Sequence, residues 1–378
     1  MMRIAYFAES LPPQTDGVSH TLSKLAEYLE NAHTDYIFFS PFKPDETLAW
    51  SSRVRKVLSI PFPLYRYYRF SLPMFENLYS ELDNFRPDLI HVTNPTALGI
   101  VGLDYARSKM IPAVSSYHTH FVHYFSYYGF KPIENLGWTY LKWFHNRCEM
   151  TYAPSRSTVT ELVSNGIKNV TLWQRGIDLD NFSPTFRDPD LRRSVGADNI
   201  PVLLFVGRLV KEKDLDDLIN ALTILKKSLQ KFKMVFVGEG PMQAELQQKL
   251  PDAHFTGFLK GEMLSRWYAS SDVFVFPSTT ETFGNVVLEA FASGLPVIGV
   301  NRGGVAELIF QGKNGFLSPP HDSQNIAYFL KLLIKNESYR KKLGQRASKM
   351  VRAYNWTSVN EQLINSYSQI ITKYYSRN

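Results

Sequence analysis

The chain has 378 residues, which is enough for two domains of ordinary size. Its composition, 44% hydrophobic and 20% charged, excludes a wholly disordered chain, and a net charge of +7 is too dilute over this length for a dedicated nucleic-acid binder. The single cysteine, Cys148, excludes an intramolecular disulfide and favours a reducing compartment.

The N-terminal half alternates short apolar runs with longer amphipathic segments. Met1–Leu11 predicts a first strand rather than a signal peptide, and a helix follows in which one face carries Val18, Leu22, Leu25, Ala26 and Leu29. Buried strands are expected at Ile4–Ala8, Tyr36–Phe39, Leu89–Val92, Val114–Tyr117 and Thr151–Ala153. Near-continuous apolar strands separated by helices indicate a parallel sheet that is covered on both faces.

The same pattern restarts after Asn181–Asn199, a stretch rich in Asp, Pro and Arg that we expect to be a linker. Strands are expected at Val202–Val206, Met234–Val237, Val273–Phe276 and Val297–Val300, with helices such as Asp216–Lys231 between them. The predicted fold class is therefore α/β, with two doubly wound Rossmann-like domains facing a cleft, the default ligand site. The domains are placed at residues 1–185 and 198–352.

The strongest functional signal is the segment from Ser278 to Val297. A strand ends at Phe276, a loop carries Glu281 and Gly284, and a helix opens near Asn285 and stops at Gly294. Glu289 lies about one turn into this helix, so both glutamates are expected near its N-terminal end. Free N–H groups there suit a phosphate or sugar oxygen, and two carboxylates can bind vicinal hydroxyls of a sugar and a ribose. Alternatively, the glutamates only complement the helix dipole.

Two further loops carry groups suited to a nucleotide ligand. Arg208 and Lys213 follow a strand end and a glycine turn, where two cations can clamp a diphosphate and stabilise it as it leaves; a solvated charged loop is the alternative. Gly17, in Asp16–Val18 after the first strand, would let the backbone approach a phosphate closely. The G-x-G-x-x-G fingerprint is absent from this turn, which disfavours an NAD enzyme.

A histidine-rich segment follows the strand at Val114. His118 is expected to contact a sugar hydroxyl or to act as a general acid or base, and a purely structural histidine is the alternative. His118, His120 and His123 resemble a metal cluster, but no carboxylate or cysteine joins them, so no metal is expected.

Together these motifs resemble the retaining glycosyltransferases of family 4, which have the GT-B fold. The resemblance rests on Glu281–Val297, Gly207–Lys213, Val237–Pro241 and Asn301–Glu307 followed by Gly312–Leu317. It extends through the N-terminal half, where the matching segments are Asp16-Gly17, Tyr117–Thr119, Ala153–Arg156 and Arg175–Asp178. Each motif alone is weak, but the combination is specific and runs nearly end to end.

The resemblance implies a role for each matching residue. Glu281 would hold the donor sugar, Glu289 the ribose hydroxyls, and Arg208 and Lys213 the diphosphate. Gly17 would contact the diphosphate, His118 would contact the donor sugar, and Leu259 would lie beside the base. The sugar and the phosphate would also contact backbone groups of Phe283, Gly284, Asn285 and Val286. The donor would be a UDP- or GDP-sugar. Family members retain the anomeric configuration and need no metal, so no cofactor is expected. The last segment, 353–378, would cross back to the N-terminal domain, with Trp356–Tyr375 as its helix.

The acceptor is less well marked. Ser51–Phe70 holds five cations and no acid, interleaved with aromatic residues, and Tyr117–Phe144 is dense in aromatics including Trp138 and Trp143. Basic and aromatic surface suits an anionic membrane interface, and the segment resembles the lipid-glycosylating branch of the family. We therefore expect a lipid or glycan acceptor, no nucleic-acid partner and a cytoplasmic protein that touches the inner face of the membrane. No run of about 18 apolar residues predicts a membrane span. Alternatively, the aromatics are core and the cations a solvated face.

Other activities share this architecture. A sugar-nucleotide epimerase would convert its substrate with no acceptor present, and a carbohydrate phosphorylase would need a lysine-bound pyridoxal cofactor. A non-catalytic sugar-binding subunit is disfavoured because both glutamates and both clamp cations are present.

Overall fold

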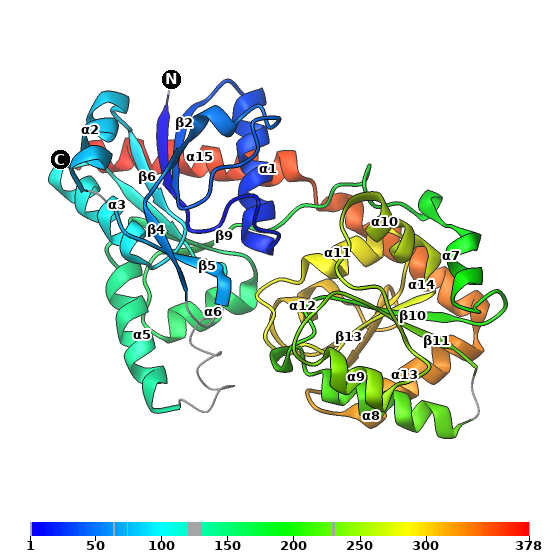
Figure 1. The fold of residues 1–378 in the computed structure, drawn as a ribbon. Coiled ribbons are helices and arrows are strands. Elements are labelled where there is room, and N and C mark those ends of the chain that lie inside the picture. Colours follow the sequence, from blue (N-terminus) through cyan, green and yellow to red (C-terminus); the bar gives the residue numbers. More distant parts are fainter. Residues whose placement is uncertain (1, 63–64, 74, 120–130, 229–230, 378) are drawn as a thin grey trace. The chain divides into compact units, whose positions relative to one another are not determined.

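The computed structural model describes residues 2–62, 65–73, 75–119, 131–228 and 231–377. They form two compact units (Figure 1). Unit 1 contains the described residues up to Arg175 together with 356–377, and unit 2 runs from Gly176 to Asn355. Residues 176–185, which the sequence analysis assigned to the first domain, thus lie in unit 2.

Unit 1 is built on a seven-stranded parallel sheet of order β3-β2-β1-β6-β7-β8-β9. The central strands are β1 (Arg3–Phe7), β6 (Leu89–Val92) and β7 (Ala113–Ser116), and the outer ones are β2 (Asp35–Ser40), β3 (Val54–Lys56), β8 (Met150–Ala153) and β9 (Val170–Leu172). After β1 the chain adds β2 and β3 on one side of it, and then returns to add β6 and the later strands on the other side. The topological switch point therefore lies between β1 and β6.

Successive side chains along each strand of unit 1 point to opposite faces of the sheet, so the apolar core of the unit has one part on each face. Ile4 and Tyr6 pack with α1 (Gly17–Asn31), whereas Ala5 and Phe7 pack with the opposite layer. That opposite layer contains α2 (Phe75–Phe85), α3 (Ala97–Ser108) and α5 (Lys131–His145). Helix α6 (Arg156–Ser164) contributes Leu162 to a smaller cluster beside β8.

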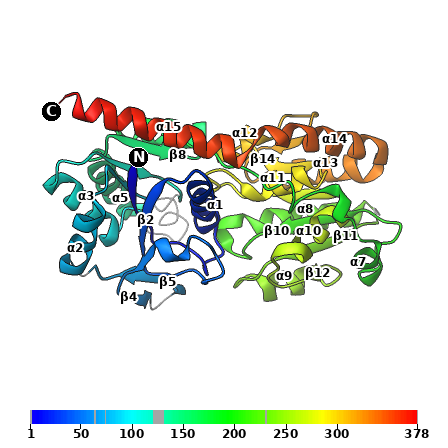
Figure 2. The ribbon, with the colours of Figure 1, turned by 90° about the horizontal axis from the view of Figure 1, so that it is seen from above.

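Helix α15 (Trp356–Tyr375) covers the α1 face of unit 1 and is red in Figure 2. Its buried positions include Leu363, Tyr367 and Ile370. The Tyr367 hydroxyl lies 2.6 Å from Nδ1 of His91 on β6, and the Tyr152 and Ser366 hydroxyls are 2.7 Å apart. The last helix of the chain is therefore joined to the sheet of the first unit by apolar packing and by buried hydrogen bonds.

Unit 2 has a six-stranded parallel sheet of order β12-β11-β10-β13-β14-β15. The strands are β10 (Val202–Val206), β11 (Lys233–Val237), β12 (His254–Phe255), β13 (Val273–Phe276), β14 (Val297–Val300) and β15 (Gly315–Ser318). Figure 1 shows α8 (Leu215–Lys227), α9 (Gln243–Lys249) and α13 (Ser323–Lys335) on one face, and α10 (Gly261–Ser270), α11 (Asn285–Ala292) and α14 (Glu337–Met350) on the other. Its switch point lies between β10 and β13.

The expected linker at Asn181–Asn199 is wrong, because this segment is an integral part of unit 2. It forms the short helices η2 (Pro184–Phe186) and α7 (Pro189–Ser194), which pack on α10. Arg192 is buried and donates to the Ser270 carbonyl at 2.7 Å and to the Asp272 carboxylate at 2.8 Å. Arg192 thus fixes the segment to unit 2, although most of its other polar residues are exposed or only partly buried.

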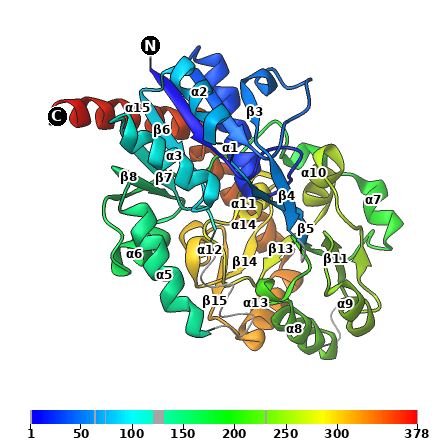
Figure 3. The same ribbon diagram turned by 60° about the vertical axis from the view of Figure 1, so that its left-hand side comes forward.

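An antiparallel hairpin of β4 (Ser59–Phe62) and β5 (Tyr65–Ser71) follows β3 (Figure 3). One face points to the body of unit 1, where the buried Ser71 hydroxyl donates to Glu9 at 2.8 Å. The other face carries Leu58, Ile60, Phe70 and Leu72, which are 45–58% exposed. Ile60 lies opposite Phe70, and Leu72 N–H donates to the Leu58 carbonyl, so these four side chains form one apolar patch, called here the hairpin face.

Candidate active site

Three of the predicted donor-site residues of unit 2 follow the two strands that flank its switch point. Arg208 and Lys213 come after β10, and Glu281 comes after β13. In an open parallel sheet the carboxyl ends of these two strands border the crevice in which ligands bind. The topology therefore brings together cations and a carboxylate that are about seventy residues apart in the chain.

Lys213 and Glu281 form an ion pair through Nζ and Oε1. Both side chains are largely buried, at 13% and 19% exposure. Lys213 ends the short helix η3 (Lys211–Lys213), and its Nζ also lies 5.8 Å from the centre of the Phe276 ring. A lysine and a glutamate paired in this way can exchange their contact for a ligand: the lysine can bind an anionic oxygen, and the glutamate can accept a hydrogen bond from a hydroxyl.

Asp214 joins the loop that carries Lys213 to the loop that carries Glu281. It is buried and adopts a left-handed conformation with φ 52°. Its Oδ2 accepts hydrogen bonds from Thr279 N–H at 2.8 Å and from the Thr279 hydroxyl at 2.7 Å. The Glu212 carbonyl accepts from the Thr280 hydroxyl at 2.9 Å. Sequence analysis missed Asp214 because its partner lies 65 residues away.

Helix α11 begins directly after the Glu281 loop. Gly284 precedes it with φ 98°, a conformation that favours glycine, and a Cβ there would lie 2.9 Å from Val305. The expected start near Asn285 and stop near Gly294 are matched by α11, which ends at Ala292. As a glycine, the N-cap residue offers α11 no side-chain hydrogen bond, and the Val287 N–H donates to the Gly284 carbonyl at 2.9 Å. The N-terminal end of a helix is a favourable place for an anion.

Not every residue of the Phe283–Val286 segment has the same surroundings. The Phe283 side chain is buried in the core of unit 2, and Val286 packs partly against that core. Both can therefore offer only backbone groups to a ligand. The glycine pair Gly303-Gly304 packs closely against this loop. The Gly304 N–H donates to the Glu281 carbonyl at 3.0 Å, and a Cβ on Gly304 would lie 2.3 Å from the Thr282 carbonyl oxygen.

Glu289 is held within unit 2 by the buried Tyr268, whose hydroxyl donates to its carboxylate at 2.8 Å. Burial raises the pKa of Glu289 to about 7. It therefore does not pair with the Lys213–Glu281 ion pair but forms a separate carboxylate one turn into α11. Burial and the hydrogen bond from Tyr268 distinguish Glu289 from a solvated glutamate that only complements the helix dipole.

The predicted site residues Arg208 and Leu259 also belong to unit 2. The Arg208 side chain is 50% exposed and its Nη2 lies 3.5 Å from Glu212. The backbone of Gly238–Gly240 packs closely against the loop that carries Arg208. A Cβ on Gly240 would lie only 2.3 Å from the Leu209 carbonyl oxygen, so only glycine fits there. Leu259 is partly buried against the core of unit 2.

In unit 1, Gly17 is exposed at the start of α1, close after the end of β1. The neighbouring Asp16 caps this helix, accepting from the N–H groups of Val18 at 2.9 Å and Ser19 at 2.8 Å. The Ser10 hydroxyl donates to the other Asp16 oxygen at 2.6 Å. The loop that carries Gly17 is thus fixed by hydrogen bonds of its own.

His118 is buried two residues after β7 and contacts Arg175, which follows β9. The Arg175 Nη2 lies 2.8 Å from His118 Nδ1. Burial, the Arg175 cation and His91 together hold the pKa of His118 well below its usual range. His120 and His123 lie outside the described residues.

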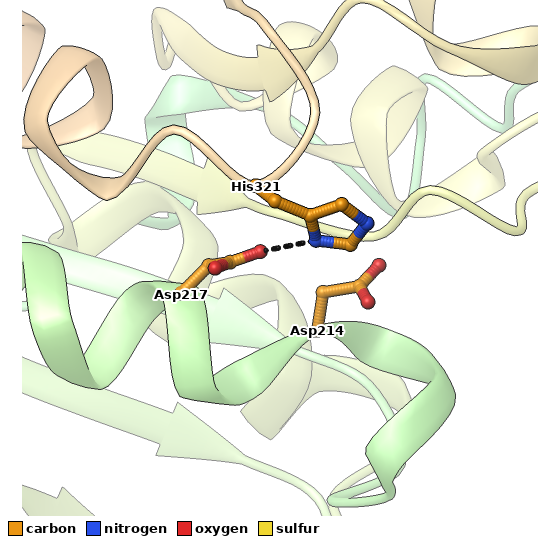
Figure 4. Close-up of side chains that lie close together, drawn as sticks. All are labelled: Asp214, Asp217 and His321. Carbon is orange, nitrogen blue, oxygen red and sulfur yellow. Dashed lines mark hydrogen bonds and ion pairs between the residues drawn. The ribbon is translucent and has the colours of Figure 1, made fainter. Parts of the chain in front are cut away.

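The group of side chains that could hold a metal among the described residues is Asp214, Asp217 and His321 (Figure 4). His321 Nδ1 lies 3.0 Å from Asp217, and Asp214 accepts the two hydrogen bonds from Thr279. Hydrogen bonding accounts for this arrangement, so we assign no metal to it.

Comparison with known proteins identifies the family. The family model described as Glycosyltransferase Family 4 matches residues 15–181, and the one described as Glycosyl transferases group 1 matches residues 187–350. The chain is 35% identical over 374 residues to a GDP-mannose-dependent alpha-mannosyltransferase of Mycobacterium tuberculosis, covering 98% of this chain and 97% of that protein. The chain belongs to the family 4 glycosyltransferases.

Other similar proteins agree with this assignment. A sulfoquinovosyl transferase of Arabidopsis thaliana is 32% identical over 98% of this chain and 74% of its own length. Sucrose-phosphate synthase of Thermosynechococcus elongatus superposes with a TM-score of 0.82 at 20% identity, covering 99% of this chain and 100% of that chain. An Anabaena protein solved with UDP and glucose superposes with a TM-score of 0.77 at 21% identity, covering 97% and 100%. The fold is GT-B, and this enzyme transfers a sugar from a nucleotide sugar to an acceptor.

Proposed function

We propose that this glycosyltransferase binds the nucleotide-sugar donor on unit 2 and transfers a hexose, with retention, to a membrane lipid. The observation that carries the donor site is the Lys213–Glu281 ion pair at the switch point of the unit 2 sheet, beside the N-terminus of α11. An anionic diphosphate, a hexose and a ribose each find a matching group there.

The proposed roles follow from charge and hydrogen-bonding capacity. Lys213 and Arg208 bind the diphosphate and stabilise the negative charge that grows on it as the bond to the sugar breaks. Glu281 accepts hydrogen bonds from sugar hydroxyls, and Glu289 accepts them from the ribose. The α11 N-terminus supplies N–H groups to phosphate oxygens. We infer attack by the acceptor on the same face as the departing diphosphate, without a metal ion or other cofactor.

The hairpin face supports a lipid acceptor. Four exposed apolar side chains lie together on unit 1, and the segment Ser51–Phe70 that contains most of them carries five cations and no acid. An apolar patch flanked by cations suits the surface of an anionic bilayer. Among the described cations, Arg53 is paired with Glu30 and Arg55 with Glu81, and Lys56 is exposed. Arg69 donates to the hydroxyl and the carbonyl of Ser59, each at 2.8 Å. The side chains of residues 62–68 lie outside the described ones.

The names of similar proteins bear on donor and acceptor. GDP-mannose-dependent mannosyltransferases are named for a donor, a sulfoquinovosyl transferase for a sugar, and monoglucosyldiacylglycerol synthases for a lipid. In the described parts of the chain no helix is long and apolar enough to cross a membrane. We therefore propose that contact with the lipid is made at the membrane surface, on the cytoplasmic side.

The donor can be found by thermal shift and hydrolysis with GDP-mannose and with UDP- and ADP-hexoses. We expect one of them to raise the unfolding midpoint and to be hydrolysed slowly without an acceptor, releasing the nucleoside diphosphate. The released sugar should keep its anomeric configuration, which NMR can follow. A sugar nucleotide converted to its epimer, or no response to any donor, would contradict the proposal.

The acceptor can then be tested by presenting diacylglycerol or phosphatidylinositol in anionic vesicles, with soluble oligosaccharides as the competing class. We expect labelled hexose to enter the lipid fraction. Transfer to the oligosaccharide alone would retain the donor assignment and refute the lipid acceptor.

A further inference from the structure

The contact between His118 and Arg175 determines which nitrogen of the histidine carries its proton. Arginine has five N–H donors and no acceptor, so the His118 Nδ1 that faces its Nη2 at 2.8 Å must accept. A neutral imidazole that accepts at Nδ1 is protonated at Nε2. The two residues are 57 positions apart and meet only because β7 and β9 belong to the same sheet.

We propose that Arg175 is a positioning residue that holds His118 as its neutral Nε2–H tautomer, so that the ring can donate a hydrogen bond through Nε2 and does not act as a base. The inference concerns unit 1 alone, and it rests on the proposed function only for its effect on sugar transfer. It decides between the two functional roles that the sequence left open for His118.

The surroundings fix Arg175 in the position that this role needs. Its Nη1 donates to the Trp173 carbonyl at 2.7 Å and to the Gln174 carbonyl at 3.3 Å. Its guanidinium carbon lies 5.1 Å from the centre of the Trp173 ring, and the same ring meets the His118 ring edge-on at 5.6 Å. Trp173 therefore packs against both partners, and its own carbonyl and that of Gln174 accept hydrogen bonds from the Arg175 guanidinium.

Among the described residues, the charged and titratable groups that lower the pKa of His118 are Arg175 and His91 of β6. Burial lowers the pKa of Arg175 to about 9, so it remains a cation at neutral pH, and burial lowers the pKa of His91 to about 3, so that ring remains neutral. A cation beside a buried imidazole opposes a second positive charge. His118 consequently stays neutral throughout the physiological range, where an ordinary histidine would titrate.

Nitrogen NMR of the full-length protein, labelled at histidine, tests the tautomer directly. His118→Asn identifies the His118 signals by their loss. We expect a protonated Nε2, an unprotonated Nδ1 and no titration from about pH 5.5 to 8.5. A proton on Nδ1, or a titration in this range, would overturn the proposal whether or not the donor and acceptor are those proposed above.

Substitution of Arg175 then tests its role in transfer. Arg175→Met keeps an unbranched side chain but removes the donor, so we expect a mixture of His118 tautomers and a fall in kcat/KM of about tenfold. Arg175→Gln can donate through its amide and should recover part of this loss. Arg107→Met, on the exposed side of α3, is the matched control. An altered His118 tautomer in Arg175→Met with unchanged turnover would refute the positioning role.

Discussion

The ion pair of Lys213 with Glu281 concentrates the proposed donor chemistry in a few side chains, which makes it testable by single substitutions. We expect Glu281→Gln and Arg208→Ala each to lower kcat/KM by about a hundredfold or more, because each removes a charge-assisted contact that strengthens as the diphosphate departs. Steady-state kinetics with the identified donor measures this, and circular dichroism checks the fold.

The matched control for these substitutions is Lys211→Ala, which removes an exposed cation from the same short helix as Lys213. It should leave the rate within about twofold of the wild type, as is usual for exposed charges away from a site. Unchanged rates in folded Glu281→Gln and Arg208→Ala would refute the donor-site assignment.

The ionised Glu289 carboxylate is expected to lower the stability of the fold and to strengthen donor binding. Burial raises its pKa to about 7 from the ordinary 4.5, so the folded state binds a proton more tightly than the unfolded state. This contribution to stability is present below about pH 4.5 and is lost as pH rises through about 7. At pH 8 the buried charge is a cost, and Glu289→Gln should raise the unfolding midpoint by roughly 2–4 °C for each kcal/mol recovered.

The same substitution should weaken donor binding, since an amide accepts hydrogen bonds from ribose hydroxyls less strongly than a carboxylate. In the wild-type enzyme, donor affinity should fall as pH decreases below about 7, because the carboxylate becomes protonated. Glu289→Gln should lose this pH dependence. Isothermal titration from pH 5.5 to about pH 8.5 measures both effects, and an identical pH profile in the variant would exclude Glu289 as the titrating group.

At the level of elements, Asp214 connects the two loops that form the donor site. Asp214→Gly removes both hydrogen bonds to Thr279 but relieves the left-handed conformation at φ 52°, so the fold should survive. We expect a fall in kcat of about tenfold, because Lys213 and Glu281 lose their fixed separation. Asp214→Asn keeps an accepting oxygen and tolerates positive φ, and it should stay within about threefold of the wild type.

A purely structural role for Asp214 would give a different pattern. In that case Asp214→Gly would lower the unfolding midpoint and leave kcat per folded molecule unchanged. Measuring kcat and thermal unfolding on the same samples separates the two roles.

Helix α15 depends on polar as well as apolar contacts for its attachment to unit 1. Tyr367→Phe leaves the ring in place but removes the hydroxyl 2.6 Å from the buried His91 Nδ1. An unsatisfied buried group costs about 1–3 kcal/mol, so the unfolding midpoint should fall by several degrees. Tyr375→Phe, at an exposed position of the same helix, should change nothing. Equal midpoints for both variants would show that the hydroxyl contributes no stability.

The sequence predicts the strands of both sheets well where apolar runs are continuous, and β6, β10, β13 and β14 agree residue for residue with the expected ranges. It also predicts α11 and α15, because glycine and helical periodicity mark their ends. The linker prediction fails since Arg192 looks like a surface residue until its partners, about eighty positions away, fold beside it. The roles that the sequence assigns to His118 and Lys213 stay predictions. From the sequence, Arg175 is only part of a matching segment and Asp214 is not singled out, because their contacts with His118 and Thr279 join segments far apart in the chain.

The acceptor segment was the least predictable part. Its alternating aromatic and basic residues left open whether they form a core or a surface, and periodicity alone could not decide which face of a hairpin points outward. In the structure Phe70 is exposed on the hairpin face and Trp143 on α5 is also exposed, whereas Trp138 packs against a small core cluster. The core interpretation is therefore confirmed for Trp138. Contact of the exposed aromatic residues with a membrane stays a prediction.

At the scale of the whole molecule, the hairpin face is expected to bind the protein to anionic membranes. The apolar pair Ile60 and Phe70 lies opposite across the two strands, so Ile60→Ser with Phe70→Ser removes the centre of the patch without touching the buried Ser71 side. Burying one such side chain contributes about 1.5–3 kcal/mol when complete. Partial burial of both should therefore make the double variant bind vesicles at least about tenfold more weakly. Vesicle flotation with and without anionic lipid measures this.

The matched control removes two exposed apolar side chains from unit 2, Ile224→Ser on α8 with Tyr328→Ser on α13. It should bind vesicles like the wild type. Binding of the wild type should also weaken with salt, because cations contribute to it. The hairpin variant should retain donor hydrolysis, since its substitutions lie in unit 1, while its transfer to lipid in vesicles falls in parallel with binding. If transfer to lipid persists when binding is lost, the lipid reaches the enzyme by another surface; if the control loses binding equally, the interaction is general apolar adhesion and the hairpin face has no special role.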